Sequence, residues 1–162
     1  MSIEKKLIEI ENTRFIFATN FSGDASRDKY KSSTRKGNLI IPDADFAQEL
    51  ADRGFNIKMT RPRDDEDPDT FEPEYFVSII VNYGPNRRLW PKVYLVGSDM
   101  HPTLLDEDTV GEIDDLWIKN VNVVLSPHEY DEGRFTLYVR TMYVELNDED
   151  DPYAARYSRS DD

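Results

Sequence analysis

The chain has no cysteine, and only two of its 162 residues are histidines, His101 and His128. Disulfide bonds and thiolate metal sites are therefore excluded, a histidine-rich metal site is not expected, and a reducing compartment is the natural environment. No apolar run approaches the ~18 residues that a membrane helix needs. The first residues lack the apolar core of a signal peptide. We expect no metal, no cofactor, no membrane contact and a cytoplasmic location.

The motifs of the common enzyme classes are also missing. The sequence contains no Gly-x-Gly-x-x-Gly, no phosphate-binding glycine-rich loop ending in Lys-Ser/Thr, and no Gly-x-Ser-x-Gly. Carboxylates are plentiful, but they lie in acidic runs typical of solvated segments, whereas a hydrolytic pair needs a fixed separation and a shifted pKa. We therefore expect a protein that is not an enzyme. A metal-dependent nuclease using the carboxylates between Asp106 and Asp115 remains an alternative.

Residues 106–113 partly match a calcium-binding loop. Asp106 and Asp108 occupy its first and third places and Gly111 its sixth. However, Val110 at the fifth place offers no side-chain ligand, and Trp117 stands at the twelfth, where calcium needs a bidentate glutamate. A structural turn is the better interpretation, with Gly111 in a backbone conformation that other residues resist.

The strongest strand pattern covers residues 135–146, which are rich in β-branched and aromatic residues and contain no glycine or proline. Strict alternation divides these side chains between two faces. One face would carry Phe135, Leu137, Val139, Thr141 and Tyr143, and the other Thr136, Tyr138, Arg140 and Met142. Because neither face is simply polar, the strand suits a small closed sheet, in which it would complete a barrel.

The remaining elements are predicted from composition and spacing. Further strands are expected over residues 7–21, 38–41, 55–60, 74–83, 90–97 and 121–125, the last ended by Ser126-Pro127. One helix is expected over 43–53, capped by Asp43 and ended by Gly54. Residues 63–73 form an acidic loop, and 99–116 a polar connection with a short helix. This order predicts a mostly β fold, an OB-like Greek-key barrel over residues 1–146, with a disordered acidic C-terminal tail over 147–162.

The net charge of −13 at first argues against a nucleic-acid partner. Its distribution changes that conclusion, because residues 61–74 carry −5 and residues 147–162 carry −4. By contrast, residues 14–36 carry +4, and residues 75–98 contain three basic residues and no acidic one. The basic residues therefore concentrate in two segments that also contain aromatic residues.

Single-stranded nucleic acid is bound by cations that follow the backbone and by flat rings that stack on bases. The sequence predicts a DNA-binding site from residues of both kinds on one loop, one hairpin and one strand. These candidates are Lys29, Tyr30, Lys31, Arg35, Lys36, Arg87, Arg88, Trp90, Lys92, Tyr138 and Arg140. The cations would neutralise phosphates, and Tyr30, Trp90 and Tyr138 would stack on bases. The competing interpretation is that aromatic residues on strands belong to the core.

Several segments together resemble the single-stranded DNA-binding proteins encoded by tailed bacteriophages. The resemblance lies in their order and spacing rather than in any one of them. They are residues 14–23, 38–43, 90–96, 103–108, 110–111, 120–127 and 138–144. The resemblance implies an OB fold and sequence-nonspecific binding that protects single strands in phage replication or recombination. It also implies a location in the cytoplasm of the host cell. It also implies an acidic tail that contacts replication or recombination proteins.

An alternative function follows from the acidity of the chain. A protein that mimics the charge of DNA would bind basic proteins through residues 64–74 and the tail, and would have no affinity for oligonucleotides. The tail itself could be an arm that docks on partners or folds over the basic groove, or simply a solubilising end.

Overall fold

A computed structural model describes residues 7–27, 32–97 and 100–147, and within them the protein is mostly β. Its nine strands form one sheet: β1 (Ile8–Thr13), β2 (Phe15–Asn20), β3 (Lys36–Ile41), β4 (Lys58–Met59), β5 (Tyr75–Ile80), β6 (Lys92–Val96), β7 (Pro102–Leu105), β8 (Ile118–Asp131) and β9 (Arg134–Leu146). The helical elements are α1 (Ala44–Asp52) and three short 3-10 helices, η1 (Ala25–Arg27), η2 (Arg87–Leu89) and η3 (Val110–Asp115). Within the described ranges, no helix is long and apolar enough to cross a membrane.

The strand order is that of a Greek-key barrel of the OB type. The main path runs β1-β8-β9-β5-β3-β2, with β9 antiparallel to β8 and parallel to β5 and β6. Among the described strands, the hydrogen-bonded path is not closed on itself. Its two ends, β1 and β2, are separated in sequence only by Arg14, whose carbonyl oxygen accepts a hydrogen bond from the Ile40 amide at 3.0 Å. The predicted OB-like fold is confirmed, with the expected first strand divided in two.

The bend between β1 and β2 is produced by an irregularity in the first strand. The pairing of β1 with β8 shifts between Ile10 and Thr13, and Asn12 lies in the left-handed region with a φ of 54°. Asparagine tolerates this conformation better than most residues. The chain can therefore pair with β8 before the bend and with β3 after it.

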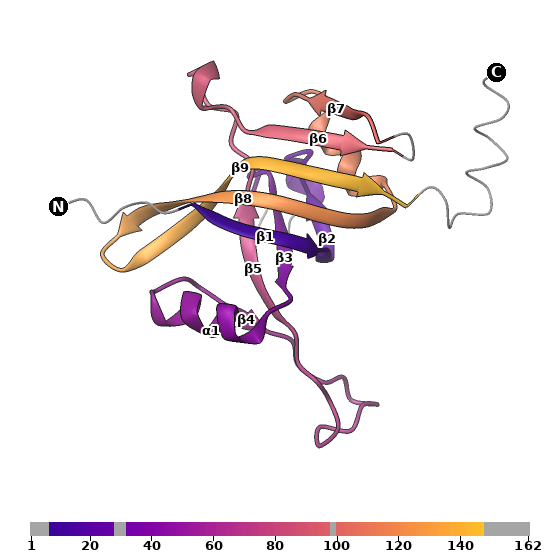
Figure 1. Ribbon diagram of the computed structural model, residues 1–162, viewed down its shortest axis with the longest axis vertical. Helices are drawn as coiled ribbons and strands as arrows, with labels where there is room; N and C mark the ends of the chain where they lie inside the picture. Colours follow the sequence, from indigo (N-terminus) through magenta and orange to yellow (C-terminus); the bar gives the residue numbers. More distant parts are fainter. Residues whose placement is uncertain (1–6, 28–31, 98–99, 148–162) are drawn as a thin grey trace, which may run out of the picture.

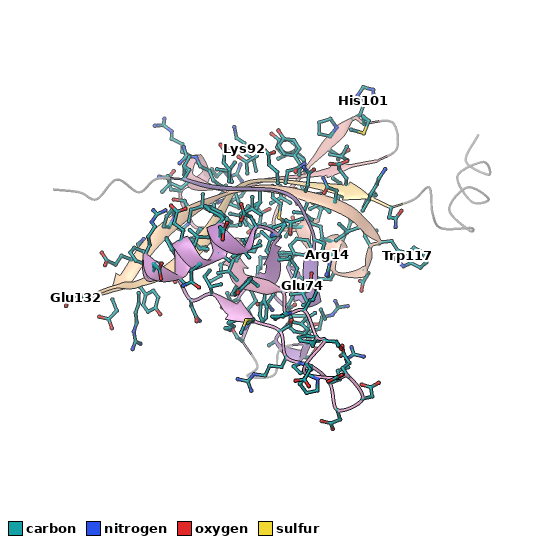
Figure 2. The ribbon with its side chains drawn as sticks, turned by 60° about the horizontal axis from the view of Figure 1, so that its bottom comes forward. Arg14, Glu74, Lys92, His101, Trp117 and Glu132 are labelled. Atoms are coloured by element: carbon teal, nitrogen blue, oxygen red, sulfur yellow. The ribbon has the colours of Figure 1, made fainter. Side chains whose placement is uncertain are left out.

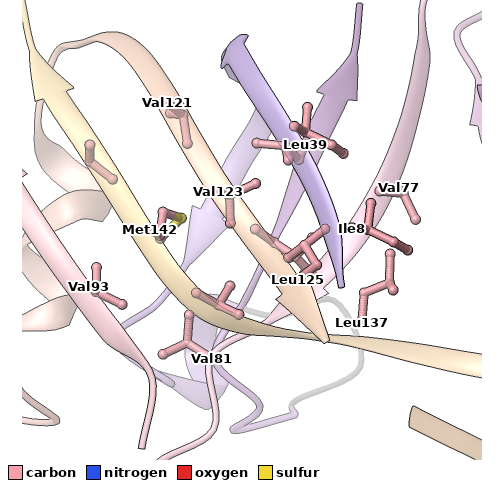
Figure 3. Close-up of a cluster of buried hydrophobic side chains, with 14 of the residues drawn as sticks. Ile8, Leu39, Val77, Val81, Val93, Val121, Val123, Leu125, Leu137 and Met142 are labelled. Carbon is pink, nitrogen blue, oxygen red and sulfur yellow. The ribbon is translucent and has the colours of Figure 1, made fainter. Parts of the chain in front are cut away.

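The core lies between two crossing halves of the curled sheet. In Figure 1, β1, β8 and β9 run across the molecule, while β2, β3 and β5 run nearly perpendicular to them. Figure 3 shows Val121, Val123 and Leu125 of β8 facing Leu39 and Val77 of the other half. All five of these side chains are buried. Strand β9 contributes Leu137, Val139, Met142 and Val144 to this core; the sequence predicted the first two on the inner face but placed Met142 on the other face.

Helix α1 has the predicted ends and covers one end of this core. The Asp43 side chain caps it by accepting hydrogen bonds from the amides of Asp45 at 2.9 Å and Phe46 at 3.2 Å. Gly54 follows with a φ of 101°, which suits glycine. The buried face of the helix carries Ala47 and Leu50. The acidic loop between β4 and β5 extends at the opposite end of the molecule from β6 and β7 (Figure 1).

Among the sequence predictions that were wrong in detail, three concern β8, β7 and Gly111. Strand β8 does not end at Pro127, which pairs with Leu137. Among the described residues the β1 ladder on the other side of β8 reaches only to Leu125, so proline is tolerated at 127. Strand β7 lies within the predicted polar connection. Gly111 is not among the glycines with a positive φ; a side chain there would instead meet the Ser22 Cβ at 2.7 Å.

Candidate nucleic-acid interface

A bulge in β9 divides this strand between two partners. On its β8 side, Val139 pairs with Leu125 and Thr141 with Val124, so Arg140 is the extra residue and has no opposite partner. On its other side, β9 pairs with β5 at Tyr138 and with β6 from Thr141 onward. A bulge changes the direction of the side chains around it. Here it places the exposed Arg140 where β5 and β6 separate.

A groove of about 420 Å³ lies at this separation. Its lining residues come from β5–β6, β8 and β9 and are Asn82, Arg88, Leu89, Trp90, Lys92, Ser126, Tyr138, Val139, Arg140 and Thr141. None of these lining residues is acidic. The three cations are exposed and the two aromatic side chains are half-buried. The groove therefore combines the two kinds of side chain that hold a nucleic-acid strand.

Trp90 is held in the groove wall by its neighbours. Its indole Nε1 donates a hydrogen bond to the Gly84 carbonyl oxygen. The Tyr83 ring lies edge-on to it, with centroids 5.3 Å apart, and the Arg87 guanidinium lies 5.1 Å from its ring centre. The η2 turn that carries Arg87 is capped by the Asn86 side chain, which accepts from the Arg88 amide at 3.1 Å. A ring fixed in this way loses little conformational freedom when a base stacks on it.

Tyr83, which supports Trp90, has a buried hydroxyl with no hydrogen-bond partner among the described residues. Burial raises its pKa to about 12; Arg35 opposes this shift, while Asp106 and Glu107 add to it. The phenol therefore resists ionisation in the folded state. The free energy of unfolding that the neutral side chain contributes is fully present below pH ~10 and is lost as the pH rises toward about 12.

Replacing Tyr83 by phenylalanine should therefore leave the free energy of unfolding at pH 7 unchanged or raise it by up to about 1 kcal/mol, because no buried hydrogen bond is lost. The loss of stability between pH 10 and 12 should become smaller in the same variant. Urea unfolding at both pH values checks this, with the exposed Tyr130 replaced by phenylalanine as the control. A clear loss of stability at pH 7 in the Tyr83 variant would show that the hydroxyl has a partner.

The structure brings most of the predicted site residues on the hairpin and on β9 together. Arg88, Trp90, Lys92, Tyr138 and Arg140 all line the groove, and Arg87 lies over Trp90. Figure 2 shows Lys92 on the side of the molecule away from the acidic loop between β4 and β5.

The other predicted residues lie elsewhere or cannot be placed. Arg35 is not among the lining residues of the groove; its Nη1 donates to the carbonyl oxygens of Phe21 at 2.8 Å and Ser22 at 3.3 Å. Its guanidinium also lies 5.7 Å from the Tyr83 ring centre. Lys36 lies on β3 and lines a second hollow. Lys29, Tyr30 and Lys31 fall outside the described residues.

The second hollow is connected to the groove by one row of paired residues. It has a volume of about 430 Å³, and its charged lining residues are Arg27, Lys36, Asp114 and Asp115. Asn20 also lines it, and both carboxylates lie beside Arg27, at 3.5 Å and 3.4 Å. Across the sheet, Asn20 pairs with Lys36, Lys36 with Ile80, Ile80 with Tyr138, and Tyr138 with Ser126. Directly paired residues point to the same face of a sheet. The row therefore crosses five strands from one hollow to the other.

Sequence reasoning missed several residues of this surface. Leu89, which is 78% exposed, and the polar Asn82, Ser126 and Thr141 carry no charge or large ring and gave no signal on their own. The place of Leu89 in the sequence, between Arg88 and Trp90, could have indicated a contact residue. His128, whose ring centre lies 5.7 Å from that of Tyr138, was considered only as a metal ligand.

Asp106, the first carboxylate of the 106–115 segment, has a structural role. The Asp106 Oδ1 accepts from the amides of Asp108 at 2.9 Å and Thr109 at 3.1 Å, and from the Thr109 hydroxyl at 3.0 Å. The hydrogen bond from the Thr109 hydroxyl is the largest cause, and together these bonds hold the pKa of Asp106 below its usual value. This is the predicted structural turn. In the described part of the chain, no group of three acidic or histidine side chains is placed to hold a metal ion.

Comparison with known proteins adds a family and a fold. A family model described as "Putative phage ssDNA-binding domain" matches residues 2–159. The single-stranded DNA-binding protein from bacteriophage Enc34, solved in complex with ssDNA, has a TM-score of 0.52 and 14% identity, covering 93% of this chain and 90% of that one. A C-terminal truncation of the Enc34 protein has a TM-score of 0.51 and 13% identity, with 93% and 88% covered. No curated protein sequence matches the chain.

Proposed function

Because the chain belongs to the phage ssDNA-binding domain family, it is a single-stranded DNA-binding protein, and we propose that it holds the strand in the groove beside the β9 bulge. One observation carries the proposed location. In a chain with a net charge of −13, the groove gathers three exposed cations and two aromatic side chains, and none of its lining residues is acidic. The structural similarity to the Enc34 protein supports the fold that presents this groove.

Each kind of side chain has a distinct role in the proposed complex. Arg88, Lys92 and Arg140 neutralise phosphates and release the counterions that surround the free strand. Trp90 and Tyr138 stack on bases, and each stacked base contributes roughly 1–3 kcal/mol whatever its identity. Because backbone charge and stacking supply the affinity, binding does not depend on sequence.

The strand continues from the groove along the row through Ile80 and Lys36 toward the second hollow. The loop between β2 and β3, which contains Lys29, Tyr30 and Lys31, begins and ends beside that hollow. OB folds commonly bind oligonucleotides on this face and with this loop. The role is binding and not catalysis: the protein coats single strands exposed during phage replication or recombination, in the cytoplasm of the host cell.

Fluorescence anisotropy of a labelled oligo-dT of about 30 nucleotides tests this function directly. We expect tight binding at low salt, a steep loss of affinity as salt increases, and poor competition by unlabelled duplex. Affinity that does not change with salt, or equal competition by duplex, would contradict the proposed mode of binding.

The acidity of the chain supports a second role, in protein contacts. In this proposal the acidic tail, residues 147–162, follows the barrel domain of residues 1–146 in the sequence and would dock on basic surfaces of replication or recombination proteins. Of these tail residues only Asn147 is described, and its amide donates to the Trp117 carbonyl oxygen at 2.8 Å. A pure DNA mimic, in contrast, would not need a groove of cations and rings.

Deleting residues 148–162 separates these two roles. The deletion removes six acidic and two basic residues, so repulsion of DNA decreases. We expect the affinity for oligo-dT to stay the same or to rise by several-fold, measured by anisotropy at fixed salt. A loss of DNA binding would contradict the division into a binding domain and a tail, whereas no DNA binding in either form would favour the DNA mimic.

A further inference from the structure

A second surface of the sheet differs in character from the DNA groove. Beside the groove, one row of paired residues crosses four strands and joins Asn122, Tyr143, Tyr94 and Leu104. The two tyrosine rings are stacked, with centroids 4.8 Å apart and planes 11° from parallel. Leu104 is 59% exposed and Tyr143 is 39% exposed. The centre of this face is therefore aromatic and apolar, and no described residue covers it.

A small hollow lies at one side of Tyr143. Its volume is about 210 Å³, and it is lined by Glu9, Glu11, Asn122, Val123, Val124, Thr141 and Tyr143. The amide of Asn12 donates to the Asn122 Oδ1 at 2.8 Å, which fixes the wall between β1 and β8. Drug-sized ligands need larger pockets, of roughly 300–1,000 Å³. The hollow has the size expected for a single side chain.

Two carboxylates form the far wall of this hollow. Glu9 and Glu11 are two residues apart on β1, so both point to the same outer face, and both are exposed. Neither side chain makes a hydrogen bond or an ion pair with any other described residue. A third carboxylate, Glu145, lies farther along β9 and accepts from the Asn120 Nδ2 at 2.9 Å. Asp114 and Asp115 of the second hollow lie beside Arg27, whereas Glu9 and Glu11 have no cationic partner among the described residues. Their charges repel phosphates, so this face is not a continuation of the DNA path.

We propose that this face docks a basic partner protein by taking one of its arginine side chains into the hollow. The planar guanidinium stacks on the ring of Tyr143, its methylene stem lies against Val124, and its donors reach the carboxylates of Glu9 and Glu11. Lysine matches this site less well because its ammonium is a compact, strongly hydrated charge that cannot stack or bind two oxygens side by side.

The position of this site has a consequence for DNA-bound protein. Thr141 lines both the hollow and the DNA groove, but the cations Arg88 and Arg140 line only the groove. The charge thus changes sign between the two surfaces, and each attracts a different partner. The partner would dock beside the bound strand without displacing it, and independently of the acidic tail.

The test uses N-acetyl-L-arginine methylamide as the probe and amide chemical shifts of the ¹⁵N-labelled full chain as the readout. We expect saturable shifts at Asn122, Val124, Thr141 and Tyr143. The matching lysine compound should require at least about 10-fold higher concentration. Saturating oligo-dT should leave the binding of the arginine probe in place.

The variant E9Q/E11Q should lose these saturable shifts, whereas E49Q/E107Q, which removes two exposed carboxylates elsewhere, should keep them. Three results would overturn the proposal. The first is the absence of saturable shifts at the four amides, and the second is equal behaviour of the two variants. The third is a shift of the same amides with protein concentration alone, which would assign this face to a second copy of the chain.

Discussion

Replacing both Arg88 and Arg140 by glutamine should weaken binding to oligo-dT by about 100-fold at low salt. Each lost charge-assisted contact with a phosphate removes about 1.5 kcal/mol, and two such losses multiply to about that factor. The slope of log affinity against log salt should also fall by about 2, because two fewer counterions are released. Both side chains are exposed, so the free energy of unfolding should change little.

The matched control for this pair replaces Arg61 and Arg63 by glutamine. These two residues are also exposed and lie in the acidic loop, so the change in net charge is the same. The control should bind oligo-dT within about 2-fold of the parent protein, since it removes no phosphate contact. Equal weakening in the two pairs would mean that binding depends on total charge and not on the groove.

Replacing Asp114 by alanine should destabilise the fold by about 3 kcal/mol, because it leaves several hydrogen-bond donors without their charged acceptor. The Asp114 side chain is fully buried and accepts from the Thr19 hydroxyl at 2.7 Å and from the amides of Phe21 at 2.8 Å and Ser22 at 3.0 Å. It also lies 3.5 Å from the Arg27 guanidinium. These contacts tie η3 to the start of the β2–β3 loop. Urea unfolding measures the loss.

Asp115 provides the control for this prediction. It is the next residue, its side chain is 73% exposed, and it lies 3.4 Å from the same arginine. Replacing it by alanine should cost less than about 1 kcal/mol, because an exposed ion pair contributes little. If Asp114 and Asp115 had similar effects, the hydrogen bonds of Asp114 would not contribute the assigned stability.

The sequence predicted the groove residues of the hairpin and β9 but not their arrangement. Arg87, Arg88, Trp90 and Lys92 were identified because cations next to rings on a turn are a local pattern. The β5–β6 connection meets β9 because β6 pairs with β9 in parallel. These segments are far apart in the sequence, so no local pattern predicts their pairing. The approach of the hairpin to the bulge could therefore be known only from the structure.

The bulge also explains the main error in the sequence analysis of β9. Strict alternation placed Met142 with Tyr138 on one face and Tyr143 with Val139 on the other. In the structure Met142 and Val139 are buried, and Tyr143 is exposed. The extra residue at Arg140 reverses the alternation, and its presence depends on the register with β8. For the same reason, the sequence analysis did not predict that Tyr143 of the proposed docking face is exposed.

The measurement that tests the account most directly is the fluorescence of Trp90 during titration with oligo-dT. The chain has only two tryptophans, so Trp117→Phe leaves Trp90 alone and Trp90→Phe leaves Trp117 alone. Trp90 lines the groove, whereas Trp117 is 61% exposed and lies away from Lys92 of the groove (Figure 2).

If bases stack in the groove, oligo-dT quenches the fluorescence of the Trp117→Phe protein, salt reverses the quenching, and the Kd agrees with that from anisotropy. The Trp90→Phe protein should show almost no quenching. Quenching of Trp117 and not of Trp90 would contradict the central claim and place the strand on a different part of the barrel.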